Sequence, residues 1–165
     1  LTIELNTMSQ ISLNINGHVH NVEVEDRALL ADVLRDNLKL TGTHVGCDTS
    51  QCGCCTILMN GDAVKSCSML AVQANGAQIT TIEGLANGAI LHPIQVAFSN
   101  CHALQCGFCT PGMIMATAGL LANNPQPTDA QIHEGLAGNL CRCTGYINIV
   151  ESVKQAAKVM QEKQA

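Results

Sequence analysis

The cysteines constrain this chain more than any other feature of its sequence. Eight of the ten fall into two quartets with different spacings. The first quartet, spaced C-x4-C-x2-C and then separated by eleven residues from a fourth cysteine, consists of Cys47, Cys52, Cys55 and Cys67. The second quartet, two close pairs separated by thirty-one residues, consists of Cys106, Cys109, Cys141 and Cys143. Two sets of four thiols predict two separate metal centres.

The spacing of the first quartet is that of the plant-type [2Fe–2S] ferredoxins, in which four thiolates hold a two-iron cluster. The second quartet has enough thiols for another such cluster, although its spacing differs. The sequence contains no serine nucleophile elbow, no phosphate-binding loop and no paired-histidine zinc motif. The chain is therefore predicted to carry electrons and to have no catalytic residues of its own.

Zinc and disulfide bonds are the alternative uses of so many cysteines. A zinc ribbon separates its cysteine pairs by about 15–20 residues, which fits neither quartet. Disulfides are typical of exported proteins, but the N-terminus has no basic segment followed by an apolar one. A Rieske-like site using His44 would need a second loop histidine, which is missing. A zinc-binding structural module stays open as an alternative function.

Two cysteines are left over. Cys54 lies inside the loop of the first quartet, where another small residue would serve as well. Cys101 lies in a helical pattern and is predicted to be a small buried apolar residue. Neither is expected to bind metal.

The composition excludes several classes of partner. A formal net charge of −5 and only three aromatic residues suit neither phosphate backbones nor stacked bases, so no nucleic-acid partner is expected. No run of 18 apolar residues exists, so no transmembrane segment is expected. Reduced thiols without a leader predict a cytoplasmic protein. Only 13% of the residues are charged, which predicts that partner subunits cover part of the surface.

The first predicted domain, residues 8–84, is rich in strand patterns. Met8 is a plausible initiation residue, and residues 1–7, whose origin is open, are left out of the predicted fold. Alternating apolar residues around Asn16-Gly17 predict a β-hairpin, and Asn60-Gly61 predicts a second one. Residues 28–38 are predicted to form one amphipathic helix, and residues 77–82 the last strand. This order is typical of a β-grasp ferredoxin.

The second predicted domain, residues 85–165, is helical and is expected to form a four-helix bundle, which makes the whole chain α+β. The predicted helices span residues 92–104, 111–123, 129–135 and 147–161. Thr110 is predicted to cap the second helix, and Thr128 opens a capping box for the third. The second quartet then occupies two loops at one end of the bundle.

Three segments carry a resemblance to a known family: GCDTSQCGCCT, QCGFCTPGM and GNLCRCTGY. They resemble the small iron–sulfur subunit of the molybdenum hydroxylases, the xanthine oxidase family, over residues 11–158. The resemblance implies a large subunit that holds molybdenum with molybdopterin cytosine dinucleotide, and a medium subunit that holds FAD. It also implies a dimer of heterotrimers.

Within that resemblance, the second quartet holds the cluster nearest molybdenum and the first quartet the one nearer FAD. Gln105 and Cys143 match positions that lie against the pterin, so the resemblance implies that they help to bind this cofactor. Electrons then pass from molybdenum through both clusters to the flavin. A free diffusible ferredoxin is the competing interpretation, but a shuttle of that kind needs only the first domain.

Three segments look most similar to the small subunits of carbon monoxide dehydrogenases and of the aldehyde oxidoreductases close to them: GCDTSQCG, VKSCSMLAVQANG and TTIEGLA. A complex of the carbon monoxide dehydrogenase type is the first expectation. Complexes that oxidise aldehydes, purines or other N-heterocycles such as nicotinate are the alternatives, because the substrate binds to the large subunit.

Overall fold

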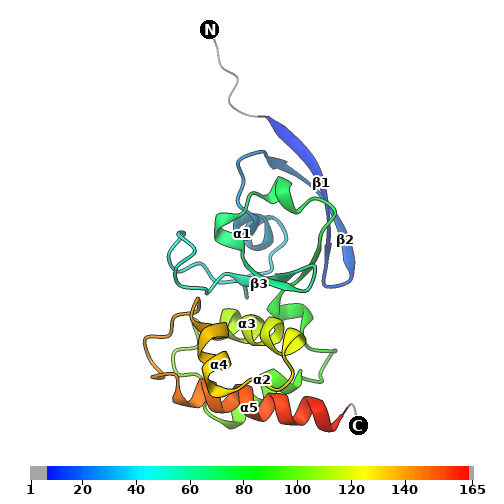
Figure 1. The fold of residues 1–165 in the computed structure, drawn as a ribbon. Coiled ribbons are helices and arrows are strands. Elements are labelled where there is room, and N and C mark those ends of the chain that lie inside the picture. The colour runs from blue at the N-terminus through cyan, green and yellow to red at the C-terminus, as the bar shows by residue number, and fades with distance from the viewer. Residues whose placement is uncertain (1–6, 164–165) are drawn as a thin grey trace.

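Alternating apolar residues and two tight turns build the upper half of the molecule (Figure 1). The computed structural model describes residues 7–163; residues 1–6, part of the segment left out of the predicted fold, and residues 164–165 lie outside them. The described chain forms two lobes: a β lobe, which contains all five strands, and a helical lobe, which contains α2 to α5. This is the predicted α+β fold.

The β lobe contains one mixed sheet with the strand order β2-β1-β5-β3-β4. Its strands are β1 Met8–Ile15, β2 His18–Glu25, β3 Thr56–Met59, β4 Asp62–Lys65 and β5 Gln78–Thr80. The central pair β1 and β5 is parallel, and the other neighbours are antiparallel. Asn16-Gly17 and Asn60-Gly61 have positive φ at both turn positions, as a type I′ hairpin turn requires. Both predicted hairpins are confirmed.

The predicted helix over residues 28–38 is shorter and wider than expected. Regular α-helix covers only α1 (Leu30–Asp32), and a π-helical turn follows at Val33–Asn37. The N–H of Leu38 donates to the carbonyl of Val33, five residues back. The wide turn keeps Leu30, Val33 and Leu34 buried while it redirects the chain toward the first quartet.

The last strand also ends earlier than predicted. β5 stops at Thr80, and Ile82–Gly84 form a 3₁₀ turn instead of continuing the strand. Ile82 and Leu85 pack against the core of the helical lobe. The segment that ends the sheet thus contributes to the second core. The domain boundary between residues 84 and 85 stays a prediction.

The helical lobe consists of four helices around one apolar core. They are α2 Pro93–Asn100, α3 Thr110–Asn123, α4 Asp129–Leu136 and α5 Ile147–Glu162. The predicted capping box of α4 is confirmed: Thr128 and Gln131 bond each other's backbone N–H groups. None of the helices within residues 7–163 is both long enough and apolar enough to span a lipid bilayer.

Two predicted helix ends are wrong. The helix expected over residues 92–104 ends at Asn100, because His102 adopts a left-handed φ of 54° and starts the link to the second quartet. Thr110 is not the cap of α3 but its first residue, and Cys109 occupies the N-cap position. The hydroxyl of Thr110 is buried without a hydrogen-bond partner among the described residues.

The two lobes meet where α3 packs beneath β3 and β4 (Figure 1). Glycine makes this close approach possible: a Cβ on Gly112 would collide with the carbonyl oxygen of Gly53 and lie 2.9 Å from the Cα of Cys54. Gly112 and the five residues that follow it are buried inside the chain. Met113, Ile114 and Ala116 face the core of the helical lobe, so both lobes together enclose this part of α3.

Candidate metal centres

The first quartet lies on a loop that wraps around its own cysteine side chains. Cys55 precedes β3 and Cys67 follows β4, so the second hairpin brings both to the loop, where they are buried. Cys47 and Cys52 lie at the outer part of the loop and are half-buried. The backbone N–H groups of Thr49 and Cys52 point at the Sγ atom of Cys47, each at 3.4 Å. The loop therefore offers hydrogen-bond donors to thiolate sulfur.

The thiols of this loop have strongly different acidities. Hydrogen bonds from the Thr49 side chain and from the backbone of Cys52 and Thr49 lower the pKa of Cys47 to about 6. Burial raises the pKa of Cys55 to about 11 and that of Cys54 to about 12. Cys55 is thus a thiol in the metal-free chain, and it would release a proton when it binds a metal.

The second quartet joins two loops at one end of the helical lobe. Cys109 is the N-cap of α3, and Cys141 and Cys143 lie in the loop before α5. The Sγ atoms of Cys106 and Cys143 are 3.6 Å apart, and both residues are exposed. The predicted meeting of two distant sequence segments is confirmed.

Polar groups also surround the second quartet. Burial raises the pKa of Cys109 to about 12. Burial would also raise the pKa of Cys141, but hydrogen bonds from Thr144 and Cys143 outweigh it and lower this pKa. Thr144 donates to the Sγ of Cys141 from both its hydroxyl, at 3.1 Å, and its N–H, at 3.4 Å. The unpartnered hydroxyl of Thr110, next to Cys109, could donate to another sulfur.

The hydrogen-bond donors around both quartets fit an iron–sulfur cluster. A tetrahedral zinc site gathers its four ligands around one ion. A two-iron cluster spreads its four thiolates over two metals and accepts hydrogen bonds at its sulfurs. Four thiols with N–H and hydroxyl donors directed at them match that requirement.

The remaining predicted residues are placed as follows. Gln105 is exposed beside the second quartet. Cys54 is buried in the first loop. It lies close enough to Cys109 of the second quartet to contribute to the raised pKa of the Cys109 thiol. The Nδ1 of His44 lies 2.7 Å from the carbonyl oxygen of Phe108, and the two rings stack. The imidazole of His44 is therefore engaged by the backbone carbonyl and the ring of Phe108, in the loop of the second quartet. This disfavours a Rieske-like role, in which the imidazole would bind iron.

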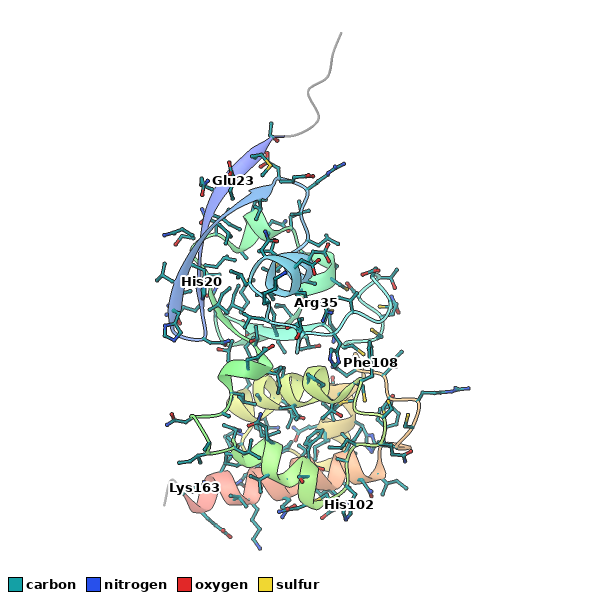
Figure 2. The ribbon with its side chains drawn as sticks, turned by 180° about the vertical axis from the view of Figure 1, so that it is seen from behind. His20, Glu23, Arg35, His102, Phe108 and Lys163 are labelled. Carbon is teal, nitrogen blue, oxygen red and sulfur yellow. The ribbon has the colours of Figure 1, made fainter. Side chains whose placement is uncertain are left out.

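Two residues that the sequence did not single out connect the quartets. Lys65, at the end of β4, and Asn139, in the loop before Cys141, form hydrogen bonds between the lobes. The three loops that carry the cysteines lie on one side of the molecule (Figure 1), and Phe108 lies at the level where the lobes meet (Figure 2). Asn139 belongs to the segment GNLCRCTGY, but nothing in the sequence pattern indicated a role for it.

The comparisons with known proteins agree with this architecture. Residues 13–86 match the family described as "2Fe-2S iron-sulfur cluster binding domain", and residues 81–154 match "[2Fe-2S] binding domain". The small subunit of nicotine 6-hydroxylase from Paenarthrobacter nicotinovorans is 52% identical over 89% of this chain and 88% of its own length. The chain belongs to the small iron–sulfur subunits of the molybdenum hydroxylase family.

Two further relatives of the family extend the comparison. Caffeine dehydrogenase subunit gamma from Pseudomonas sp. (strain CBB1) is 49% identical over 89% of this chain and 90% of its own length. A chain in the crystal structure of quinoline 2-oxidoreductase from Pseudomonas putida 86 superposes with a TM-score of 0.91. It is 44% identical, and the match covers 96% of this chain and 99% of that one. Family membership therefore rests on both lobes together.

Cys101 provides a test of which cysteines bind metal. Its half-buried thiol donates to the Oε1 of Gln155, on α5, at 2.8 Å. We expect Cys101→Ala to keep the full iron content and both cluster signals, with a loss of stability of about 1 kcal/mol from one weak hydrogen bond. Iron analysis and EPR of the purified variant check this. Loss of either cluster would show that the two quartets are assigned wrongly.

Proposed function

We propose that this chain is the electron-transfer subunit of an oxidoreductase complex, with one [2Fe–2S] cluster held by each quartet. The first quartet would bind its cluster through Cys47, Cys52, Cys55 and Cys67. The second would bind its cluster through Cys106, Cys109, Cys141 and Cys143. When bound, such clusters supply one-electron redox chemistry. The residues of the chain itself would hold them, exclude water from them and donate hydrogen bonds to their sulfurs.

The observation that carries this proposal is the placement of the two quartets. The second quartet is at the surface, since Cys106 and Cys143 are exposed, whereas Cys55 and Cys67 of the first are buried. The loops of the two quartets touch, because the N–H of Leu140 donates to the carbonyl of Cys52 at 2.8 Å. A chain with two adjoining redox centres, one of them open to the surface, suits transfer between partner subunits.

An apolar rim around the second quartet supports a partner on that side. Leu104, Phe108 and Leu140 are each two-fifths to one-half exposed and lie next to its cysteines in sequence. Exposed apolar side chains of this size, grouped around a functional loop, are typical of protein interfaces. We assign this rim to the large subunit, which would hold molybdenum with molybdopterin cytosine dinucleotide. Gln105 and Cys143 would then face the pterin.

The other partner in the proposal is a medium subunit that holds FAD and accepts electrons from the first quartet's side. Electrons would enter at the second quartet and leave from the first. The dimer of heterotrimers, the cytoplasmic location and the lack of a nucleic-acid partner stay predictions.

The relatives favour an N-heterocycle as the substrate of the complex. By their names, three of the similar proteins act on nicotine, caffeine and quinoline, at 44–52% identity, and others at 38–43% are aldehyde oxidoreductases. The expectation of a carbon monoxide dehydrogenase has no support from these relatives. We therefore place N-heterocycle hydroxylation first, ahead of aldehyde or carbon monoxide oxidation.

Anaerobic reduction of the purified complex tests the proposal. Adding a quinoline or pyridine substrate is expected to bleach the visible iron–sulfur absorbance, because electrons from substrate reach both clusters. The isolated chain is expected to be bleached by dithionite but not by substrate. Bleaching of the isolated chain by substrate would contradict a role limited to electron transfer. Bleaching of the complex by carbon monoxide or an aldehyde alone would overturn the substrate assignment.

A further inference from the structure

Lys65 ends β4 and extends its side chain across the boundary between the lobes. Its Nζ donates to three oxygens: the carbonyl of Gly138 at 2.8 Å, the Oδ1 of Asn139 at 2.9 Å and the hydroxyl of Thr56 at 3.1 Å. An ammonium group has three N–H donors and no acceptor, so the three oxygens satisfy it completely. No carboxylate of residues 7–163 pairs with it.

Asn139 completes the connection from the other side. Its side chain is buried, and its Nδ2 donates to the carbonyl of Gly53 at 2.9 Å and to the hydroxyl of Thr56 at 3.2 Å. Its Oδ1 accepts from Lys65, so every hydrogen-bonding site of the amide nitrogen and one of the oxygen is used. Thr56 in turn donates to Gly53 at 2.7 Å. A buried network with this degree of satisfaction fixes its members in one arrangement.

The residues joined by this network belong to the two cluster loops. Gly53 lies between Cys52 and Cys55 of the first quartet, and Asn139 stands two residues before Cys141 of the second. The approach is too close for a side chain on Gly53, where a Cβ would lie 2.6 Å from the Cγ of Asn139. The carbonyl of Gly53 therefore meets the Asn139 amide directly. Any shift of one loop has to move the other.

The charge of Lys65 also lies beside the first quartet. Thr56, which accepts from its Nζ at 3.1 Å, directly follows Cys55, and Lys65 itself stands two residues before Cys67. The surrounding oxygen acceptors are neutral, so the ammonium is free to stabilise negative charge on the neighbouring sulfurs. A reduced cluster is one unit more negative than an oxidised one, and a fixed positive charge nearby favours the reduced state.

We propose that Lys65 and Asn139 lock the loop of the first quartet to the loop of the second and so set the spacing between the two clusters. In this arrangement both are positioning residues, and Lys65 additionally favours reduction of the first-quartet cluster. The inference rests on the proposed function, since it needs a cluster in each quartet.

The test compares Lys65→Met with wild type in the full chain carrying both clusters. Methionine keeps an unbranched apolar side chain one atom shorter than that of lysine, but removes the charge and the three donors. We expect the dipolar interaction between the two reduced clusters, measured by pulsed EPR, to become weaker and more broadly distributed. The reduction potential of the first-quartet cluster should become more negative, while that of the second changes less. Lys154→Met, which removes an exposed lysine paired with Asp129, is the matched control and should change neither.

Asn139→Ala distinguishes the effect of the hydrogen bonds between the loops from the effect of the Lys65 charge. It also tests the connection of the loops if Lys65→Met fails to assemble its clusters. It removes the amide but keeps the ammonium, so the dipolar interaction should weaken while the potential stays closer to wild type. Wild-type dipolar interaction in the variants that assemble would overturn the lock. If wild type itself contained only one cluster, the proposed function would fail instead, which the same spectra show.

Discussion

Replacing Cys106 by serine is expected to remove one of the two cluster signals and about half of the iron, while the other cluster remains. Cys106 is exposed at the edge of the second quartet, 3.6 Å from Cys143. Serine is a hard, weakly acidic ligand, whereas iron–sulfur clusters require soft thiolates. The cluster would be left with three thiolates and an open position facing solvent, where it is lost.

Cys52→Ser provides the reciprocal experiment, because Cys52 belongs to the first quartet. It is expected to remove the other signal and to spare the one that Cys106→Ser removes. EPR of the reduced variants and iron analysis on the same samples measure both effects. The two variants should have complementary spectra whose sum resembles wild type. If both variants lost the same signal, the division of the cysteines into these quartets would be wrong.

Gly112→Ala is expected to lower the free energy of unfolding by about 3 kcal/mol, at the upper end of the usual cost of overpacking. The new Cβ would collide with the backbone of Gly53 and Cys54, which cannot move aside as a flexible side chain would. The added methyl would push α3 away from the first quartet's loop. Thermal bleaching of the iron–sulfur absorbance measures the effect, and the apparent Tm should fall by about 6–12 °C.

Gly135→Ala is the control for this prediction. Its Cβ would meet only the end of the Leu120 side chain, which can move, and Gly135 is exposed on α4. Alanine also favours helix by about 0.5–1 kcal/mol over glycine. The apparent Tm of this variant should stay near wild type or rise slightly. A Gly112→Ala protein as stable as the Gly135→Ala protein would contradict the close packing of the two lobes.

The parts of the fold that depend on local sequence could be predicted. Asn-Gly turns require positive φ and therefore mark both hairpins, and the Thr128 capping box marks the start of α4. The apolar spacing of α5 also gave its bounds to within one residue. These signals arise within a few residues, so they do not depend on the rest of the chain.

The parts that depend on contact between distant segments could not be predicted. Arg35 donates to the carbonyls of Thr41 and Thr43, and these bonds accompany the π-helical turn that the apolar pattern could not indicate. The close approach of Gly112 to the backbone of Gly53 and Cys54 follows from packing between the two lobes, which the sequence could not indicate. The early end of α2 likewise serves the link to the second quartet.

The candidate site, like the fold, could be predicted only in part. Spacing alone identified the two quartets, because cysteine is rare and its ligand patterns are specific. The bonds between them were not identified, since Lys65 and Asn139 are ordinary residues in sequence and meet only across 74 positions of the chain. Relations between the two centres therefore came only from the three-dimensional structure.

Low-temperature EPR of the dithionite-reduced chain, with iron measured on the same sample, tests the central claim most directly. Two distinct cluster signals and about four irons per chain are the predicted result. One signal with about two irons per chain would contradict the account, because one quartet would then serve another purpose.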